Sequence, residues 1–563
     1  MINFDEKDQQ SRLTALLRKE AEEAAKRRAE NLGYPYEDLN LRSVNTEALR
    51  VVPEEKAKEA RLVLFEKKDR DIWVGVFSTE NDQTKKLLKQ LQDDGYKPKI
   101  HIVSEESLKK AFRLYQDISQ TEKTEAGTFD ISSERIEELS DNFSNIRDIK
   151  SKLDEYFQSS TGGKNTSRIL EVVMGGGLAI DASDIHLEPG EKTTRLRYRL
   201  DGALIETAEV PTNTYRSLLS RIKLLSGMKL NISSEAQDGR FGINYGDSEI
   251  DIRVSVIPDE NGESIVMRIL NPESITVPLS DLGMYPRFLT TLREQIKKPN
   301  GMILTTGPTG SGKTTTLYAC LREIYSPETK ILTIENPVEY HLEGIVQTQT
   351  DEERGYTFAS GLRAALRQDP DVIMVGEIRD RETAETAVNA ALTGHLVFST
   401  LHTNNSAGTF ARLLELGINP KVICSALNLS MAQRLVRKLC PNCKKEVQLE
   451  GKNKEKIDTL LSTIKQPEYL ENLQTEKVWE AVGCKECNEM GYSGRVGLYE
   501  GILTTGQIEK IVIDNPSERE IINAARDQGL LFMNQDAVIK ILQGKTSITE
   551  AETTVSLTTD MLE

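Results

Sequence analysis

The chain has 563 residues, of which 38% are hydrophobic and 28% charged, so it is long enough for three or four domains with ordinary cores. Its formal net charge of −16 argues against a protein whose main task is to grip nucleic acid, because such proteins usually carry a basic face. A locally basic groove on an acidic protein remains the alternative. The first residues lack the apolar run of a signal peptide, and no window approaches 18 uncharged apolar residues. We therefore expect a cytoplasmic protein that meets a membrane only through partners.

The first part of the chain is predicted to be a small α/β domain over residues 1–118. Residues 1 to about 30 are rich in Ala, Glu, Lys and Arg and predict an exposed helix. Strands are expected at 62–65 and 72–77, and helices at 82–94 and 105–116. The polar, acidic segment that follows has few apolar positions in register. We expect a linker, partly helical, over residues 119–164.

A second domain is predicted over residues 165–280. It opens with a helix, and alternating apolar positions then predict strands at 184–188 and 194–200. Asp201-Gly202 is typical of a hairpin turn. A helix at 213–227 and two further alternating strands, at 249–257 and 264–270, complete an α+β pattern.

The third domain is predicted over residues 281–435, where apolar strands alternate with helices, as in a parallel sheet covered by helices. A cysteine-bearing segment over 436–500 and a helical region over 501–563 complete the chain. The fold class expected for the whole protein is α/β.

A glycine-rich loop follows the apolar strand predicted at 301–306 and precedes a helix predicted at 315–325. The loop reads Gly-Pro-Thr-Gly-Ser-Gly-Lys-Thr, the pattern that binds phosphate in this strand–loop–helix context. Glycines allow backbone N–H groups to turn toward a phosphate, and the helix N-terminus adds its positive dipole end. We expect Lys313 to reach the β- and γ-phosphates of ATP and Thr314 to bind Mg²⁺. The predicted nucleotide-binding residues are Gly307, Pro308, Thr309, Gly310, Ser311, Gly312, Lys313, Thr314 and Thr315.

Acidic and histidine side chains follow other strands of the same predicted sheet. The apolar run at 371–377 ends in Glu377, and ligands gather at the carboxyl ends of parallel strands. We expect Glu377 to hold Mg²⁺ or a water molecule in its shell. Glu339 closes the strand segment at 334–339, and His395 and His402 flank the strand predicted after residue 395. Glu335 is a second carboxylate in that segment, and polar capping of strand ends is the alternative for Glu335, Glu339 and both histidines.

Two Cys-x-x-Cys pairs, Cys440/Cys443 and Cys484/Cys487, predict a metal centre. Each pair offers two thiolates on one side of a metal, and two pairs complete a tetrahedron around zinc. Four protein ligands leave no open position, so the expected role is structural.

With these motifs in place, the chain from about 165 to 550 resembles the secretion ATPases of type II secretion and type IV pilus assembly. The family's aspartate box, Walker B segment and histidine box correspond to residues 331–340, 366–380 and 393–404. The resemblance implies a RecA-like ATPase core preceded by a PAS-like domain. It implies that Glu339 orients the attacking water, that Glu377 is the Walker B acid, and that His395 and His402 sense the γ-phosphate.

The same resemblance implies arginine fingers. Residues 182–186, Gln-Asp-Gly-Arg at 237–240 and Asp-Ile-Arg at 251–253 are similar to the family's second N-terminal domain, whose strand arginines reach toward the phosphates. Arg253 and Arg268 match these positions. For Arg363, Arg367 and Arg379, a surface ion pair and a catalytic part remain open alternatives.

Two features refine the resemblance. The aspartate box usually reads Glu-Asp-Pro, whereas here Asn336 stands in the middle, keeping the shape and losing the charge. If the usual Asp tunes the metal site, turnover would be slower; if it only fixes the loop, Asn serves. The tetracysteine insertion and the segment at 491–500 match assembly and export motors, whereas the shorter retraction motors lack the insertion.

The resemblance further implies a homohexamer, an inner-membrane platform protein and a membrane-associated adaptor as partners, and pilin-like cargo. The N-terminal domain resembles the family's first N-terminal domain only loosely. Some relatives bind a cyclic dinucleotide there, but the glycine-spaced motif for that ligand is not found, so we do not predict it. A nucleic-acid translocase and a nucleotide-binding scaffold that does not hydrolyse are the competing functions. Pilus assembly and secretion are not separable from the sequence.

Overall fold

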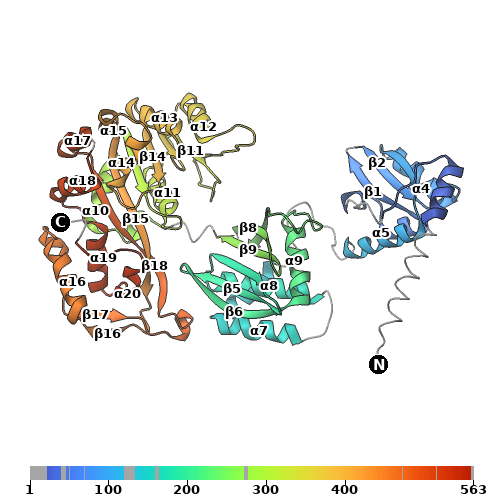
Figure 1. Cartoon of the computed structure of the whole chain (residues 1–563), viewed down its shortest axis with the longest axis horizontal. Helices are drawn as coiled ribbons and strands as arrows, with labels where there is room; N and C mark the ends of the chain where they lie inside the picture. Colours follow the sequence, from blue (N-terminus) through green and yellow to red (C-terminus); the bar gives the residue numbers. More distant parts are fainter. Residues whose placement is uncertain are drawn as a thin grey trace. The chain divides into compact units, whose positions relative to one another are not determined.

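The computed structural model describes residues 22–39, 46–49, 51–68, 70–118, 133–158, 164–246, 248–271, 277–471, 473–514 and 516–559. The chain divides into two compact units, residues 1–126 and 127–563, and each is described by itself (Figure 1). Of the helix predicted over the first 30 residues, residues 22–32 are helical, and residues 1–21 lie outside the described part. Within the described part, no helix has the length and apolar character needed to cross a bilayer.

The first unit is built on a three-stranded sheet of β1 (Leu62–Lys68), β2 (Asp71–Val76) and β3 (Lys97–Ile102). β1 and β2 are antiparallel, whereas β2 and β3 are parallel and joined through helix α4 (Asp82–Asp93). Asn81 caps α4 by accepting a hydrogen bond from the backbone N–H of Gln83 at 3.0 Å. Helices α2 (Thr46–Leu49), α3 (Glu54–Glu59) and α5 (Glu105–Ile118) complete the unit. The strands and helices predicted here are confirmed.

The second unit begins with a six-stranded antiparallel sheet in the order β6-β5-β4-β9-β8-β7. Its strands are β4 (Asp184–Pro189), β5 (Thr193–Leu200), β6 (Ala203–Pro211), β7 (Gln237–Tyr245), β8 (Ser248–Asp259) and β9 (Gly262–Leu270). Helices α8 (Lys164–Ala179) and α9 (Thr212–Leu225) contribute to the same core. The predicted hairpin turn is confirmed, because Asp201 and Gly202 both have positive φ, 48° and 88°, as a type I′ turn requires.

Two further helices, α6 (Ser133–Asn142) and α7 (Ile146–Gln158), lie inside the segment that was predicted to be a linker. Their apolar residues Ile136 and Ile149 are fully buried in the core of the six-stranded sheet. Helix α8 makes room for them with glycines. A Cβ on Gly175 would lie 3.1 Å from the Cβ of Leu139, and one on Gly176 would lie 2.9 Å from the Cδ1 of Ile149. The core of this domain therefore starts near residue 133.

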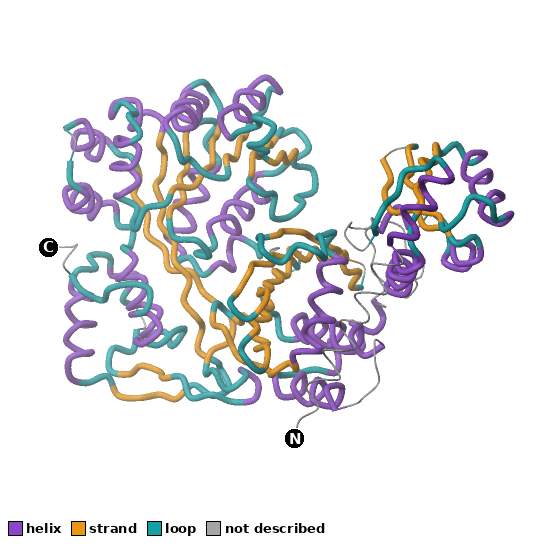
Figure 2. Tube along the Cα trace, turned by 45° about the vertical axis from the view of Figure 1, so that its right-hand side comes forward, coloured by secondary structure: helices purple, strands orange, loops and turns teal. Residues whose placement is uncertain are grey.

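A seven-stranded sheet forms the second large domain of this unit, in the order β12-β11-β13-β14-β10-β15-β18. All neighbouring pairs are parallel except β15 with β18. The strands are β10 (Gly301–Thr306), β11 (Ile331–Glu335), β12 (Val346–Gln349), β13 (Val372–Val375), β14 (Leu396–Leu401), β15 (Leu427–Leu439) and β18 (Tyr492–Leu503). Helices cover the sheet, as Figure 2 shows in purple beside the orange strands. The predicted α/β class is confirmed.

The helices of this domain before β15 are α10 (Pro286–Ile296), α11 (Lys313–Ile324), α12 (Phe358–Ala365), α13 (Arg381–Leu392), α14 (Gly408–Glu415) and α15 (Pro420–Ala426). The long strands β15 and β18 run side by side (Figures 1 and 2). Since β18 lies within the predicted cysteine segment, the sheet extends past residue 435. Between these strands come β16 (Lys445–Gln448), α16 (Gly451–Ser462) and β17 (Lys477–Glu480).

The C-terminal helices α17 (Gly506–Ile513), α18 (Glu518–Ala525), α19 (Met533–Leu542) and α20 (Ile548–Glu552) follow β18. A buried ion pair fixes α19 to this strand. The ammonium of Lys540 donates to Asp536 and, at 2.7 Å, to the carbonyl of Gly497, and Asp536 accepts from the backbone N–H of Tyr499 at 2.8 Å. Both charged side chains are 3% exposed. Burial lowers the pKa of Lys540, and Asp536 opposes this shift.

We predict that Asp536→Ala destabilises the protein by about 3–5 kcal/mol, because it leaves the Lys540 ammonium buried without its counter-ion. The double variant Asp536→Leu with Lys540→Met removes both charges and is expected to melt close to the wild type. Thermal melting of the three proteins checks this. A double variant that melts as low as the single one would show that the ion pair itself, rather than the unpaired charge, sets the stability.

Candidate active site and metal centre

The loop at residues 307–312 lies between β10 and α11, at the carboxyl edge of the sheet, and its glycines have conformations that other residues avoid. Gly307, Gly310 and Gly312 have φ values of 152°, 77° and 86°. A Cβ on Gly307 would lie 2.5 Å from the backbone oxygen of Gln433, and one on Gly312 would lie 2.7 Å from the amide nitrogen of the Gln433 side chain. The two ends of the loop, at Gly307 and Gly312, are therefore packed against β15 too closely for a side chain.

Lys313 opens helix α11 and reaches back across this loop. Its ammonium donates to the carbonyl oxygens of Gly307 at 2.7 Å and Pro308 at 3.0 Å. Burial lowers the pKa of Lys313, while the charge of Glu377 opposes that shift. The half-buried Thr314 and Thr315 follow in the first turn of the helix. A positive helix end, a glycine-rich loop and a lysine together make an anion site.

Glu377 and His402 are brought together beside this loop by neighbouring parallel strands. Glu377 lies two residues after β13, and His402 directly after β14. The Nε2 of His402 is 3.2 Å from one Glu377 oxygen, and Arg379 pairs with the other at 2.6 Å. The segment after β14 is fixed to the start of the loop by hydroxyl contact between Thr306 and Thr403 at 2.7 Å.

His395 lies at the opposite edge of the sheet from the phosphate loop. Gly301 at the start of β10 pairs with Leu396, and its N–H donates to the His395 carbonyl at 3.1 Å. The ring nitrogen Nδ1 of His395 contacts the carbonyl of Ala390 at 3.0 Å. The phosphate loop begins at the other end of β10, about 17 Å away at the rise of a parallel strand. The expectation that His395 senses the γ-phosphate therefore disagrees with its position.

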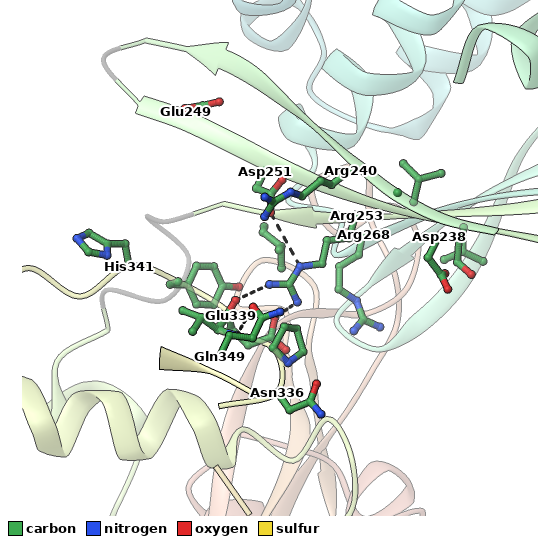
Figure 3. A pocket seen from close by; sticks show the side chains of 18 residues that line it. Asp238, Arg240, Glu249, Asp251, Arg253, Arg268, Asn336, Glu339, His341 and Gln349 are labelled. Atoms are coloured by element: carbon green, nitrogen blue, oxygen red, sulfur yellow. Dashed lines mark hydrogen bonds and ion pairs between the residues drawn. The ribbon is translucent and has the colours of Figure 1, made fainter. Parts of the chain in front are cut away.

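A cleft of about 1320 Å³ lies between strands β7–β9 and the loop that follows β11 (Figure 3). Arg253 of β8 crosses it and donates to the Glu339 carboxylate at 2.8 Å and to the carbonyl of Val338. Arg268 of β9 donates to Asp184 at 2.9 Å, and its side chain is 59% exposed. Asn336 also lines the cleft, on the Glu339 side.

The strand register aligns the cleft arginines in one row. Arg240 pairs directly with Arg253, and Arg253 with Arg268, on three neighbouring strands. Like charges directly opposite each other destabilise a sheet unless anions compensate them. Glu339 and Asp184 supply part of the negative charge that compensates the arginines. Arg253 and Arg268 were expected from the resemblance, whereas Arg240 was not, because its place in the row depends on the register of the consecutive strands β7, β8 and β9.

Arg434 of β15 was also not predicted from the sequence as a site residue. Its guanidinium donates to the backbone carbonyls of Asn404 at 2.7 Å and Gln433 at 3.0 Å, and a Cβ on Gly307 would lie 3.0 Å from its Nη1. Burial lowers the pKa of Arg434, and Glu500 opposes this shift. A half-buried cation thus lies against the phosphate loop.

The remaining arginines that the sequence left open lie in ion pairs or local contacts. Arg363 pairs with Glu382, and Arg367 donates to the carbonyl of Arg363 at 3.0 Å. Arg379, as described above, pairs with Glu377. Only Arg379 of these three therefore contacts an acid that the sequence assigned to the site.

The four predicted metal ligands form one cluster. The sulfur atoms of Cys440, Cys443, Cys484 and Cys487 all lie within 4.8 Å of one another. Three of the sulfur pairs are 3.7, 3.8 and 3.9 Å apart. Zinc–sulfur bonds of about 2.3 Å in a tetrahedron place sulfurs about 3.8 Å apart, so the cluster has the size of a zinc site.

Backbone N–H groups support the cluster, as thiolate ligands require. The amides of Cys484 and Gly491 both donate to the sulfur of Cys487 at 3.2 Å, and that of Gly483 donates to the sulfur of Cys443 at 3.4 Å. The donor set and its spacing fit a structural metal ion.

The fold and the loop define a P-loop nucleotide-binding protein with a RecA-like core. Comparison with known proteins identifies the family of this P-loop protein. Residues 161–553 match the family model for type II/IV secretion system proteins, and residues 32–122 match the MshEN domain. The chain therefore belongs to the type II/IV secretion system protein family, which confirms the resemblance inferred from its motifs.

Two curated relatives show the extent of the similarity. The type II secretion system protein E of Pseudomonas aeruginosa is 44% identical over 383 residues, 68% of this chain and 74% of that protein. The type IV pilus assembly ATPase PilB of Myxococcus xanthus is 36% identical over 521 residues, 92% of this chain and 88% of that protein. Among solved structures, the ATPase DotB of Yersinia pseudotuberculosis covers 71% of this chain and 95% of its own length at 21% identity, with a TM-score of 0.50, and supports the fold alone.

We predict that Gly307→Ala weakens ADP binding at least about tenfold, because the added Cβ meets the backbone oxygen of Gln433 and forces the loop open. Gly355→Ala is the matched control. Gly355 also has positive φ, 74°, but its Cβ would meet nothing within 4 Å. The control is expected to lose about 1–2 kcal/mol to backbone strain and to bind ADP normally. Titration with a fluorescent ADP analogue measures the affinity of both variants for the nucleotide. Equal affinities would contradict the packing argument.

Proposed function

We propose that this ATPase is the subunit of a hexameric motor that drives type IV pilus assembly or type II protein secretion. The observation that carries the proposal is the convergence of a phosphate loop, Lys313, Glu377 and His402 at one sheet edge, in a chain that also carries an arginine row facing Glu339. A motor needs a hydrolysis site whose parts come from domains that can move against each other.

Each group of residues would have a separate role in the hydrolysis of ATP. ATP supplies the phosphoryl group that is transferred to water, and Mg²⁺ neutralises charge on its oxygens. Lys313 and the loop amides would hold the phosphates, while Thr314 and Glu377 would hold the metal ion. Glu339 would orient the attacking water. His402 hydrogen-bonds Glu377 and would transmit the state of the site to the segment after β14.

Arg253 and Arg268 are proposed to complete the site. Arginine suits this role because its charge is permanent and its planar fork matches phosphate oxygens. In the structure Arg253 binds Glu339, an anion that a phosphate group could replace. Exchange of that partner would move β8 relative to the loop after β11, and in a ring such closures can be made in sequence. The proposal holds whether the arginines act within one chain or on a neighbour's nucleotide.

We place the motor at the cytoplasmic face of the inner membrane. It would be held there by a polytopic platform protein and by an adaptor that binds the N-terminal domain, with pilin-like subunits as cargo. The proposal rests on the relatives, which are named for both pilus assembly and type II secretion. Nucleic acid is not an expected partner.

The first prediction of this proposal concerns turnover. The purified protein is expected to hydrolyse ATP only with Mg²⁺, as a hexamer in size-exclusion chromatography with mass analysis. Glu377→Gln removes the charge proposed to hold the metal ion, and should lower kcat by about a hundredfold or more. Glu455→Gln, an exposed glutamate of α16, is the control and should keep full activity. Full activity in Glu377→Gln, or stimulation of turnover by DNA, would contradict the proposal.

The second prediction concerns the metal. We expect one zinc ion per chain by elemental analysis, lost in Cys484→Ser together with several degrees of thermal stability, because a structural metal site contributes directly to folding. Cys424→Ser is the matched control, since Cys424 lies outside the cluster. A zinc content that survives in Cys484→Ser would show that the four thiolates do not form the site.

A further inference from the structure

Glu335, the last residue of β11, is a buried acid whose partners are all neutral. Its side chain accepts hydrogen bonds from the Tyr318 hydroxyl, from the Thr333 hydroxyl at 2.6 Å and from the Gln347 amide at 3.2 Å. The residue is 3% exposed, and within the described part of the chain it forms no ion pair. Burial raises the pKa of Glu335, whereas these three hydrogen bonds oppose the shift. A buried carboxylate is costly unless such bonds satisfy it, so the surrounding groups must be held in place.

Gln347 of β12 connects this acid to the loop that carries Glu339. Its amide nitrogen also donates to the carbonyl of Tyr340 at 2.8 Å, and its oxygen accepts from the N–H of Leu342 at 2.6 Å. Two residues on, the Gln349 oxygen accepts from the N–H of Val338 at 3.3 Å. Two glutamines on one face of an edge strand therefore hold the backbone on both sides of Glu339.

Tyr318 connects the same acid to the phosphate loop. It lies on α11, five residues after Lys313, and is 1% exposed. Burial and the nearby Glu335 raise the pKa of Tyr318, which keeps its hydroxyl a hydrogen-bond donor. Its ring also packs edge-on against Tyr340, with centroids 6.5 Å apart. One chain of side chains thus runs from the P-loop helix to the residue that follows Glu339.

We propose that Tyr318, Glu335 and Gln347 are positioning residues for hydrolysis, which fix the Glu339 loop relative to the phosphate loop. The inference rests on the proposed function, because it assumes that Glu339 orients the attacking water. Errors of about 1 Å in such a group can lower the rate about a hundredfold. The network also explains how Asn336 can replace the usual aspartate. Gln347 and Gln349 hold the backbone around Glu339 without a charge at position 336.

The test uses Gln347→Met and Tyr318→Phe in the full-length protein. Both substitutions keep the size of the side chain and remove hydrogen bonds of the network. We expect kcat to fall about tenfold to a hundredfold, while KM and the Kd for ADP stay within about twofold of wild type. The controls are Gln543→Met, at an exposed position, and Tyr469→Phe, which removes an equally buried hydroxyl bonded to Gly529. Both controls should keep the wild-type kcat.

A double-mutant cycle separates positioning from a general structural effect. If the network acts through Glu339, Gln347→Met should change the residual turnover of Glu339→Gln by less than about twofold. A full multiplicative loss in that background would overturn the proposal, as would a joint rise of KM and ADP Kd with the fall in kcat.

The outcome also distinguishes the two proposals. If Glu339→Gln keeps wild-type turnover, the role given to Glu339 in the proposed function fails. If Glu339→Gln is inactive and both network variants keep the wild-type kcat, only the positioning proposal fails.

Discussion

The phosphate loop depends on one steric constraint, which is that its backbone at Gly307 and Gly312 lies too close to β15 for a side chain to fit. A binding site for a multiply charged anion needs positive groups that cannot swing away, and backbone N–H groups held by a packed loop meet that need. The constraint explains why the loop must follow the central strand β10, between β14 and β15, and why Gln433 and Arg434 of β15 lie against it. The rest of the site is arranged around this fixed point.

Two parallel strands on one side of β10, β14 beside it and β13 beyond β14, bring the other groups to the same edge. β13 delivers Glu377 and β14 delivers His402, because the carboxyl ends of parallel strands meet there. The cleft that holds Arg253 and Glu339 is built differently, since its two sides come from an antiparallel sheet and from the loop after β11. Its row of three arginines is balanced by acidic side chains, because Glu339 and Asp184 bind Arg253 and Arg268, and Asp238, Glu249 and Asp251 line the same cleft. A terminal phosphate would therefore have to take the place of a carboxylate as the partner of an arginine.

Local chemistry was predictable from the sequence, and long-range register was not. The phosphate loop, the Asp201-Gly202 turn and the cysteine pairs are specified by neighbouring residues, so their patterns identify them. The strand flanked by His395 and His402 was also predicted. The carboxyl-end rule for parallel strands places only His402 at the site, whereas the role of His395 came from the resemblance, and His395 lies at the amino end of the strand. The segment at 133–158 was predicted to be partly helical, but not to belong to the core, because its few apolar positions pack against glycines of α8 about 30 residues later. Arg240 depends on the register of β7 and β8, whereas Arg434 and the Glu335 network depend on contacts between side chains of different elements, which a local pattern does not specify.

The most direct test of the account is a structure of the Glu339→Gln protein with ATP and Mg²⁺. The account predicts that the phosphates lie on residues 307–314 and that at least one guanidinium of the row, from the same chain or a neighbour, contacts the terminal phosphate. A nucleotide whose phosphates contact only the P-loop side, with the row still bound to acidic side chains, would contradict it.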